Sequence, residues 1–141
     1  MVGGIFTMMD ISASALRAER ARMNVHANNM ANVHSTRDKD GNLNPYRRKR
    51  IFFKTGAPDI TGSERYGVSV DRIEPDTTTD FIKKYQPGHP DAGPDGYVSY
   101  PNVQIPLEMV DMMIAQRAYQ ANITAMESAK QIMRGALQII A

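Results

Sequence analysis

Apolar residues recur every three or four positions along the first fifth of the chain. The segment from Ile5 to about Asn32 contains no Pro or Gly, which removes the usual helix breakers. Alternating steps of four and three form a heptad pattern, typical of a helix that packs lengthwise on another helix. At 1.5 Å per residue this helix would be about 40 Å long. Its expected seam consists of Val2, Phe6, Met9, Ala13, Leu16, Arg20, Met23, Ala27 and Met30.

A second helix is predicted at the C-terminal end, from Pro106 to Ile140. Proline suits a first helical position, and Glu108 and Asp111 place negative charge in the first turns, where the helix dipole favours it. Two stripes run along this helix. One consists of Met109, Met112, Gln116, Tyr119, Ile123, Met126, Lys130, Met133, Leu137 and Ile140, and the other of Ala118, Ala121, Ala125, Ala129, Ile132, Ala136 and Ile139.

A helix with two such faces needs two sets of neighbours, and the N-terminal helix covers only one of them. We therefore expect one face to form a seam within the chain and the small-residue face to contact other protein molecules. The expected intrachain seam joins Leu16, Met23, Ala27 and Met30 to Met112, Tyr119, Ile123 and Met126. The expected assembly face contains Ala118, Ala121, Ala125 and Ala129.

Residues 37–101 predict short strands separated by turns. The turn sequence "DKDGNLNP" precedes "YRRKRIFFK", and the turn "TGAPDITGSE" separates that strand from "YGVSVDRI", where Val68 and Val70 alternate with polar residues. A further strand is expected from Phe81 to Tyr85, followed by the loop "QPGHPDAGPDG". The predicted fold is mainly α with a small β insert. Its parts are an N-terminal helix (1–36), a central β/loop segment (37–101) and a C-terminal helix (102–141), with the long helices pairing as a coiled-coil-like domain.

Composition narrows the class of protein further. Aromatic residues make up only 7% of the 141 residues, while there are ten Met and no Trp, which favours helix contacts over a bulky core. A net charge of +2 is too balanced to indicate nucleic-acid or membrane binding by itself. No apolar run reaches the roughly 18 to 20 residues of a membrane span. The N-terminus lacks the features of a cleaved secretory signal, so we expect any export to use a route without one.

Candidate chemistry is sparse. His26 and His34 are eight positions apart, which is not the spacing of a helical zinc pair, and the P-loop, G-x-S-x-G and G-x-G-x-x-G motifs are all missing from the sequence. We expect no enzyme activity, no catalytic residue, no metal and no cofactor. The alternative function is a small basic module that binds nucleic acid or an anionic surface through "RRKR", Arg47 to Arg50. We favour instead a solvated strand or a patch that meets acidic partner surfaces.

The stretch "RMNVHANNMANVHST", residues 22–36, is unusually rich in asparagine for a helix. Asparagine is a poor helix former, because its side chain competes for backbone hydrogen bonds. Here these amides are expected to bond to the backbone at the helix end or to reach a neighbouring helix. Asn28, Asn29 and Asn32 are therefore expected to fix the helix end and to belong to the assembly interface.

The same stretch carries a family resemblance. "SALRAERARMNVHANNMANVHST" resembles the N-terminal signature of the bacterial flagellar axial proteins, the rod and hook family, in which a helix ends in an N-N-x-A-N turn. The match runs through Asn28, Asn29, Ala31 and Asn32. Downstream, "PYRRK", "YQPGHPDAGPDGYVSYPNV" and "EMVDMMIAQRAYQAN" are similar to the proximal-rod members of that family.

This resemblance implies a structural protein of the flagellar basal body, in the part of the rod that crosses the periplasm. The terminal helices would form an inner domain lining a tubular rod, with the central β segment outward. The rod would transmit torque and enclose the export channel. The implied partners are other copies of the chain, the rod proteins FlgB, FlgF and FlgG, the rod–membrane-ring adaptor FliE and the flagellar type III export apparatus. Neither nucleic-acid binding nor direct membrane insertion is implied.

Overall fold

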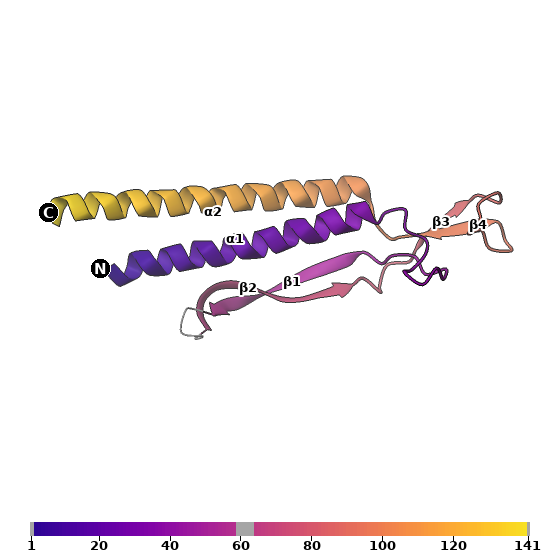
Figure 1. Ribbon diagram of the computed structural model, residues 1–141, viewed down its shortest axis with the longest axis horizontal. Helices are drawn as coiled ribbons and strands as arrows, with labels where there is room; N and C mark the ends of the chain where they lie inside the picture. The colour runs from indigo at the N-terminus through magenta and orange to yellow at the C-terminus, as the bar shows by residue number, and fades with distance from the viewer. Residues whose placement is uncertain (1, 59–63, 141) are drawn as a thin grey trace. The chain divides into compact units, whose positions relative to one another are not determined.

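The structure is a computed structural model that describes residues 2–58 and 64–140. Two long helices, α1 (Val2–Ala31) and α2 (Ile105–Ile140), lie at the two ends of the sequence. Between them come four strands, β1 (Lys49–Pro58), β2 (Glu64–Pro75), β3 (Ile82–Tyr85) and β4 (Tyr97–Tyr100) (Figure 1). The prediction of two long terminal helices with a small β insert is confirmed.

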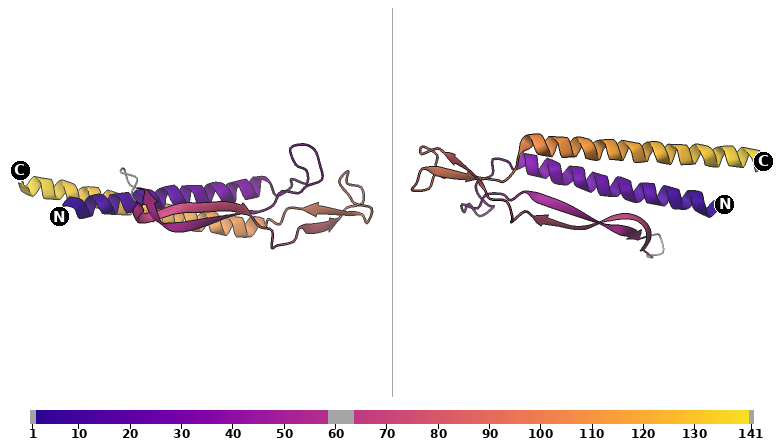
Figure 2. Two further views of the ribbon diagram at one scale, coloured as in Figure 1. Left: turned by 90° about the horizontal axis from the view of Figure 1, so that it is seen from below. Right: turned by 180° about the vertical axis from the view of Figure 1, so that it is seen from behind.

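The chain divides into two compact units. The first contains α1 up to Met23, residues 51–72 of the β1–β2 hairpin, and α2 from Met113 onward. The second contains residues 24–50 and 73–112, and so includes the end of α1, the β3–β4 hairpin and the first turns of α2. Within the first unit, the α1 and α2 segments run alongside each other in opposite directions (Figures 1 and 2).

In the first unit the β1–β2 hairpin is attached to α1 through a buried serine. The side chain of Ser14 is 1% exposed; its hydroxyl donates to the carbonyl of Ile11 (2.7 Å) and accepts from the backbone N–H of Val68 (3.1 Å). The guanidinium of Arg22 lies over the ring of Phe53 in β1, 4.7 Å from its centroid. Because the buried Ser14 hydroxyl both donates and accepts, it is not left unpaired. Its bond from Val68 attaches the hairpin to the helix.

The β1 strand is longer than its sequence suggests. We expected "TGAPDITGSE" to be a turn, but Thr55 to Pro58 continue β1, so that part of the prediction is wrong. Gly56 has a φ of 87°, which only glycine adopts readily, and its carbonyl accepts a hydrogen bond from the Ser69 hydroxyl (2.7 Å). The glycine therefore bends the strand without ending it. Residues 59–63 of the expected turn lie outside the described part of the chain.

The second unit contains a small antiparallel hairpin. Strand β3 pairs with β4 in the register Ile82↔Tyr100 to Tyr85↔Tyr97, and residues 86–96 form the connecting loop. The expected strand near Phe81 to Tyr85 and the expected loop are thereby confirmed, whereas β4 was not predicted. Val98 of β4 is fully buried and lies close in sequence to the buried Pro101 and Val103. With Val25 of α1, they are the buried apolar residues described in the second unit.

Candidate functional site

A fully buried carboxylate lies at the centre of the second unit. Glu108 is in the first turn of α2 and is 0% exposed. Its Oε2 accepts hydrogen bonds from Nδ1 of His26 (2.6 Å) and Nδ2 of Asn29 (3.0 Å), while its Oε1 accepts from Nε of Arg48. The end of α1, the segment before β1 and the start of α2 thus meet on one side chain. We call the network around Glu108 the polar junction.

The protonation state of Glu108 follows from its surroundings. Burial raises the pKa of its carboxyl group, and the hydrogen bonds from Asn29, His26 and Arg48 lower it by more, so the pKa ends below its ordinary value of 4.5. The helix N-terminus also favours negative charge at this position. Glu108 is therefore ionised at neutral pH and compensated by three donor side chains from two other segments, the end of α1 and the residues before β1.

Asn29 connects the helix end to the beginning of β1. Its Oδ1 accepts from the backbone N–H of Lys49 (2.8 Å) and from the hydroxyl of Tyr46 (2.9 Å). Its Nδ2 donates to the carbonyl of Lys49 (3.0 Å) as well as to Glu108. The side-chain amide of Asn29 therefore bonds to both the N–H and the carbonyl of Lys49, as the backbone of a neighbouring β-strand would. Asn29 is 0% exposed, so every one of these bonds is shielded from water.

A second buried amide holds the segment between β2 and β3. The Oδ1 of Asn102 accepts from the backbone N–H of Arg48 (2.8 Å), and its Nδ2 donates to the carbonyls of Asp76 and Thr79 (both 3.2 Å). The backbone N–H of Asp76 in turn donates to the carbonyl of Arg48 (2.7 Å). Arg48 is thus held by its backbone on one side and by Glu108 through its side chain.

The carboxylate of Asp76 organises the turn that follows β2. It accepts hydrogen bonds from the hydroxyl and backbone N–H of Thr78 and from the hydroxyl and backbone N–H of Thr79. The hydroxyl bonds, that of Thr78 first, hold the pKa of Asp76 well below its usual range. This carboxylate therefore remains ionised under all ordinary conditions and stabilises the turn.

The polar junction makes stability dependent on pH. Because the folded-state pKa of Glu108 lies below its ordinary value of 4.5, the unfolded chain binds the proton more tightly. The stability that Glu108 contributes is complete above that value and is lost as the pH falls through the folded-state pKa. We therefore expect the urea concentration at the unfolding midpoint to decrease once the pH is lower than about 4.5. The decrease should be less steep in Glu108→Gln, and unfolding curves at pH values between about 7 and 3 would measure both. Glu127→Gln at an exposed site is the control; identical acid profiles for all three proteins would contradict the assignment.

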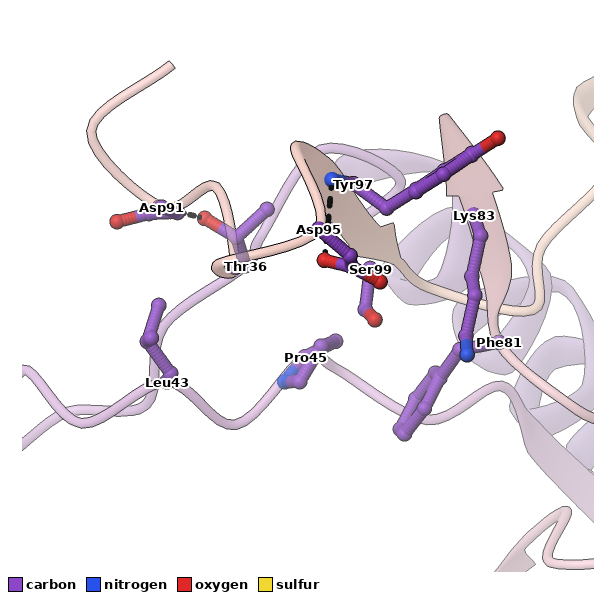
Figure 3. Close-up of a pocket in the computed structure, with 10 residues that line it drawn as sticks. Thr36, Leu43, Pro45, Phe81, Lys83, Asp91, Asp95, Tyr97 and Ser99 are labelled. Carbon is purple, nitrogen blue, oxygen red and sulfur yellow. Dashed lines mark hydrogen bonds between the residues drawn. The ribbon is translucent and has the colours of Figure 1, made fainter. Parts of the chain in front are cut away.

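An open pocket of about 290 Å³ lies beside the β3–β4 hairpin in the second unit. Figure 3 shows Thr36, Leu43 and Pro45 facing Phe81, Lys83, Tyr97 and Ser99 across it, with Asp91 and Asp95 near the loop. Asp91 accepts from the hydroxyl of Thr36 (2.6 Å) and from the guanidinium of Arg37. These bonds, that of Thr36 first, lower the pKa of Asp91. Asp91 thus ties the β3–β4 loop to the segment after α1.

The basic run "RRKR" does not form one exposed patch. The guanidinium of Arg47 lies 4.2 Å from the ring centroid of Phe81 and donates to the carbonyl of Asp76 (3.2 Å). The guanidinium of Arg48 forms an ion pair with Glu108, and the ammonium of Lys49 lies 5.8 Å from the ring centroid of Tyr46. Because the first two residues are bound within the chain, the run offers little to a phosphate backbone.

The histidines have structural partners. His26 donates to Glu108, and Nδ1 of His89 accepts from the backbone N–H of Asp91 (3.0 Å). Among residues 2–58 and 64–140, no three His, Cys, Asp or Glu side chains converge as a metal site would require. Neither helix, over the residues that the structure describes, has an apolar stretch long enough to cross a membrane.

The structure leaves most of the expected intrachain seam half-buried. Ala27 differs, because it is exposed. In the second unit the buried residues of α1 are instead Val25, His26 and Asn29, and the last two belong to the polar junction. In the first unit the most buried helical residues are small. The half-buried members of the expected seam are Leu16, Met23, Met30, Met112, Tyr119, Ile123 and Met126, and the small buried residues are Ser14, Ala18, Ala115 and Ala129.

The expected assembly alanines of α2 divide between two faces. Ala121 and Ala125 are exposed and Ala118 is half-buried, but Ala129 is only 3% exposed. Ala129 lies two heptads after the buried Ala115, so it shares that residue's covered face. The outward stripe continues from Ala125 through Ser128 and Ile132, both exposed.

The asparagines at the end of α1 differ in the partners that their side chains bind. The Nδ2 of Asn28 donates to the carbonyl of Asn24 and the Nδ2 of Asn32 to that of Asn28, each at 2.8 Å, so these amides bond to the backbone one turn earlier. The expected bonding of amides to the backbone at the helix end is confirmed for these two. Asn29, grouped with them by its sequence, has its side chain inside the polar junction and turned to partners in its own chain.

Comparison with known proteins places this architecture in a family. Residues 9–37 match the model for the flagella basal body rod protein, and residues 95–139 match the model for the flagellar basal body rod FlgEFG protein C-terminal region. Three relatives are flagellar basal-body rod proteins FlgC. The one from Bacillus subtilis is 39% identical over 95% of this chain and 97% of its own. That from Borreliella burgdorferi is 40% identical over 97% and 98%, and that from Salmonella typhimurium is 39% identical over 92% of each.

Both ends of the chain therefore carry the features of flagellar rod proteins, which are structural proteins and not enzymes. With about two-fifths of its residues identical to these relatives over nearly its whole length, the chain belongs to the FlgC family of flagellar basal-body rod proteins.

Proposed function

We propose that this protein is a structural subunit of the proximal rod of the flagellar basal body. The near full-length similarity to FlgC proteins carries this proposal. In it, the chain assembles with copies of itself, with the rod proteins FlgB, FlgF and FlgG, and with the adaptor FliE. It reaches the periplasmic rod through the flagellar type III export apparatus without a cleaved signal peptide. The assembled rod transmits torque and encloses the export channel.

In this proposal the terminal segments, 1–36 and 102–141, pair as a coiled-coil-like inner domain, and residues 37–101 face outward. The half-buried apolar residues of both helices support the pairing, because they recur at heptad spacing. The large exposed side chains of α2 support assembly, since contiguous apolar surface on a soluble chain marks an interaction site. They include Leu107, Met109, Val110, Met113, Ile114, Ile132 and Leu137.

The outward small-residue stripe is the proposed contact with adjacent subunits. Ala121 and Ala125 are exposed at its centre, where the lack of long side chains lets another backbone approach closely. Many such helix contacts acting together would carry torque without dependence on one residue.

Replacing Ala125 with arginine is expected to block incorporation into the rod. A long charged side chain would separate the two helices, and a loss of about 1.4 kcal/mol at an interface already weakens its affinity about tenfold. We would measure the protein in isolated basal bodies and the swimming of cells that have only this copy. The control is Glu127→Arg, which adds the same side chain at an exposed site two positions away, off the stripe. Normal incorporation of Ala125→Arg would rule out this face.

A further inference from the structure

The outward face of α2 is electronegative at its N-terminal end. Asp111 lies four positions after Leu107 and three before Ile114, so the three side chains share the stripe that continues through Ala118, Ala121 and Ala125. The Asp111 carboxylate is 43% exposed, and its one ion-pair contact within the described residues is a long one, 3.6 Å to Arg48. Leu107 and Ile114, on either side of it, are 56% and 53% exposed. A charged group thus sits between two apolar side chains that are each more than half exposed.

The neighbourhood of Asp111 adds to this negative charge. A pocket of about 220 Å³ opens beside it, lined by Arg48, Asp76, Asn102, Gln104 and Glu108 among others. Hydrogen bonds keep both Asp76 and Glu108 ionised, so the lining contains three carboxylates, with Asp111, and one guanidinium, that of Arg48. Arg47 is bound to the Asp76 carbonyl, and the imidazole of His26 to Glu108. Such a surface favours a binding partner with long cationic side chains, whose aliphatic portions cover Leu107 and Ile114.

The chain itself carries a complementary surface on α1. Arg17 and Arg20 are three positions apart, so they share one face of the helix, and both are exposed. Neither makes an ion pair with the described part of its own chain. The same face continues through the exposed Asn24, Ala27 and Ala31 with steps of four and three. It is a second heptad stripe with positive charge at its beginning and small residues toward its end.

We propose that Arg17 and Arg20 of one copy dock on the Asp111 end of α2 in a second copy. This inference rests on the proposed function, because it names the partner surface within the assembly. The arginine stems cover Leu107 and Ile114, and the guanidinium groups pair with Asp111 and the electronegative pocket behind it. Since a face of α1 meets a different face of α2, the contact is heterologous, the type of interface that can repeat from copy to copy along a helical assembly.

The test uses charge reversal in two separate proteins, Asp111→Arg and the double variant Arg17→Glu/Arg20→Glu. Each would be expressed alone, or together with the other, in cells that lack the native copy. Alone, each variant places like charges at every contact, and we expect its amount in isolated basal bodies to fall at least about tenfold. Together, the two variants can alternate: glutamates meet the new arginine at one contact, and native arginines meet native Asp111 at the next. We therefore expect co-expression to restore incorporation to within about twofold of the unmodified protein.

Each outcome decides the question. Rescue only on co-expression supports the contact, because altered folding of either variant would not be cured by the other. Unimpaired incorporation of the single variants, or two defects without mutual rescue, would overturn it. Arg117→Glu, which reverses an exposed charge elsewhere on α2, controls for net charge. The proposed function is tested separately by the unmodified protein: if that protein is missing from basal bodies, the rod assignment itself fails.

Discussion

Replacing Glu108 with alanine is expected to lower the free energy of unfolding by about 3 to 5 kcal/mol, the usual cost of breaking a buried charge pair. The change removes the common acceptor of His26, Asn29 and Arg48, and leaves their donors without that partner. Denaturant unfolding followed by circular dichroism would measure the difference. Because three segments meet on this side chain, limited proteolysis should also show faster cleavage between α1 and β1.

The matched control is Asp111→Ala, one helical turn further along α2. Its carboxylate is 43% exposed and its contact with Arg48 is long, 3.6 Å, so its removal should cost no more than about 1 kcal/mol. Where Glu108→Ala does not accumulate as folded protein, Glu108→Gln keeps the shape and one acceptor oxygen and should give an intermediate loss. Equal stabilities for the Glu108 and Asp111 variants would show that the polar junction does not hold the second unit together.

The helices could be predicted from the sequence because their signal is local. Heptad spacing and the missing breakers define α1 and α2 without knowledge of any neighbour. The spacing does not show which part of the protein covers each face of these helices. In the first unit α1 also carries the β1–β2 hairpin through Ser14, so its most buried residues, Ser14 and Ala18, lie beside the expected seam and not on it. A hairpin formed by distant residues leaves no periodic signal in the helix that it covers.

The polar junction was missed for a related reason. Glu108 has a sufficient local explanation as a negative charge at a helix N-terminus, which gives no hint that it is buried. Its partners come from separate segments, and a single sequence does not tell that they converge. The one usable signal was the excess of asparagine at the end of α1. Two of these amides, Asn28 and Asn32, do bond to the local backbone, and only the tertiary structure distinguishes Asn29 from them.

The basic run illustrates how a charge pattern is misleading without its partners. Read along the sequence, Arg47 and Arg48 are adjacent cations of the kind that bind phosphates. In the fold, adjacent residues of an extended chain point to opposite sides, and each meets a different partner, Phe81 for the first and Glu108 for the second. The carboxylates that pair with Arg48, those of Glu108 and Asp111, are far away in the sequence. Charge clusters on extended segments are therefore better judged residue by residue than as a block.

Asn29→Asp is expected to destabilise the protein by about 3 to 4 kcal/mol at neutral pH, although it changes one atom's identity. The new carboxyl group keeps the acceptor for Lys49 N–H and Tyr46, but loses the donor that reaches the Lys49 carbonyl and Glu108. It also places an oxygen where Nδ2 now lies, 3.0 Å from Oε2 of Glu108. Two buried carboxylates at that distance repel each other, so one pKa must rise.

The pH dependence separates this repulsion from a simple lost bond. Because the folded-state pKa of the carboxylate pair is raised, the cost is largest at high pH and should shrink as the pH falls through that raised value. Urea unfolding of Asn29→Asp and the parent protein at matched pH values would show the two curves converging toward acid pH. Asn28→Asp, with the same change at the exposed neighbouring position, should cost no more than about 1 kcal/mol, because the Asn28 amide is exposed and bonds to the Asn24 carbonyl one turn earlier. A penalty for Asn29→Asp that does not depend on pH would mean that the pairing of Asn29 with Lys49, and not its contact with Glu108, is what stabilises the helix end.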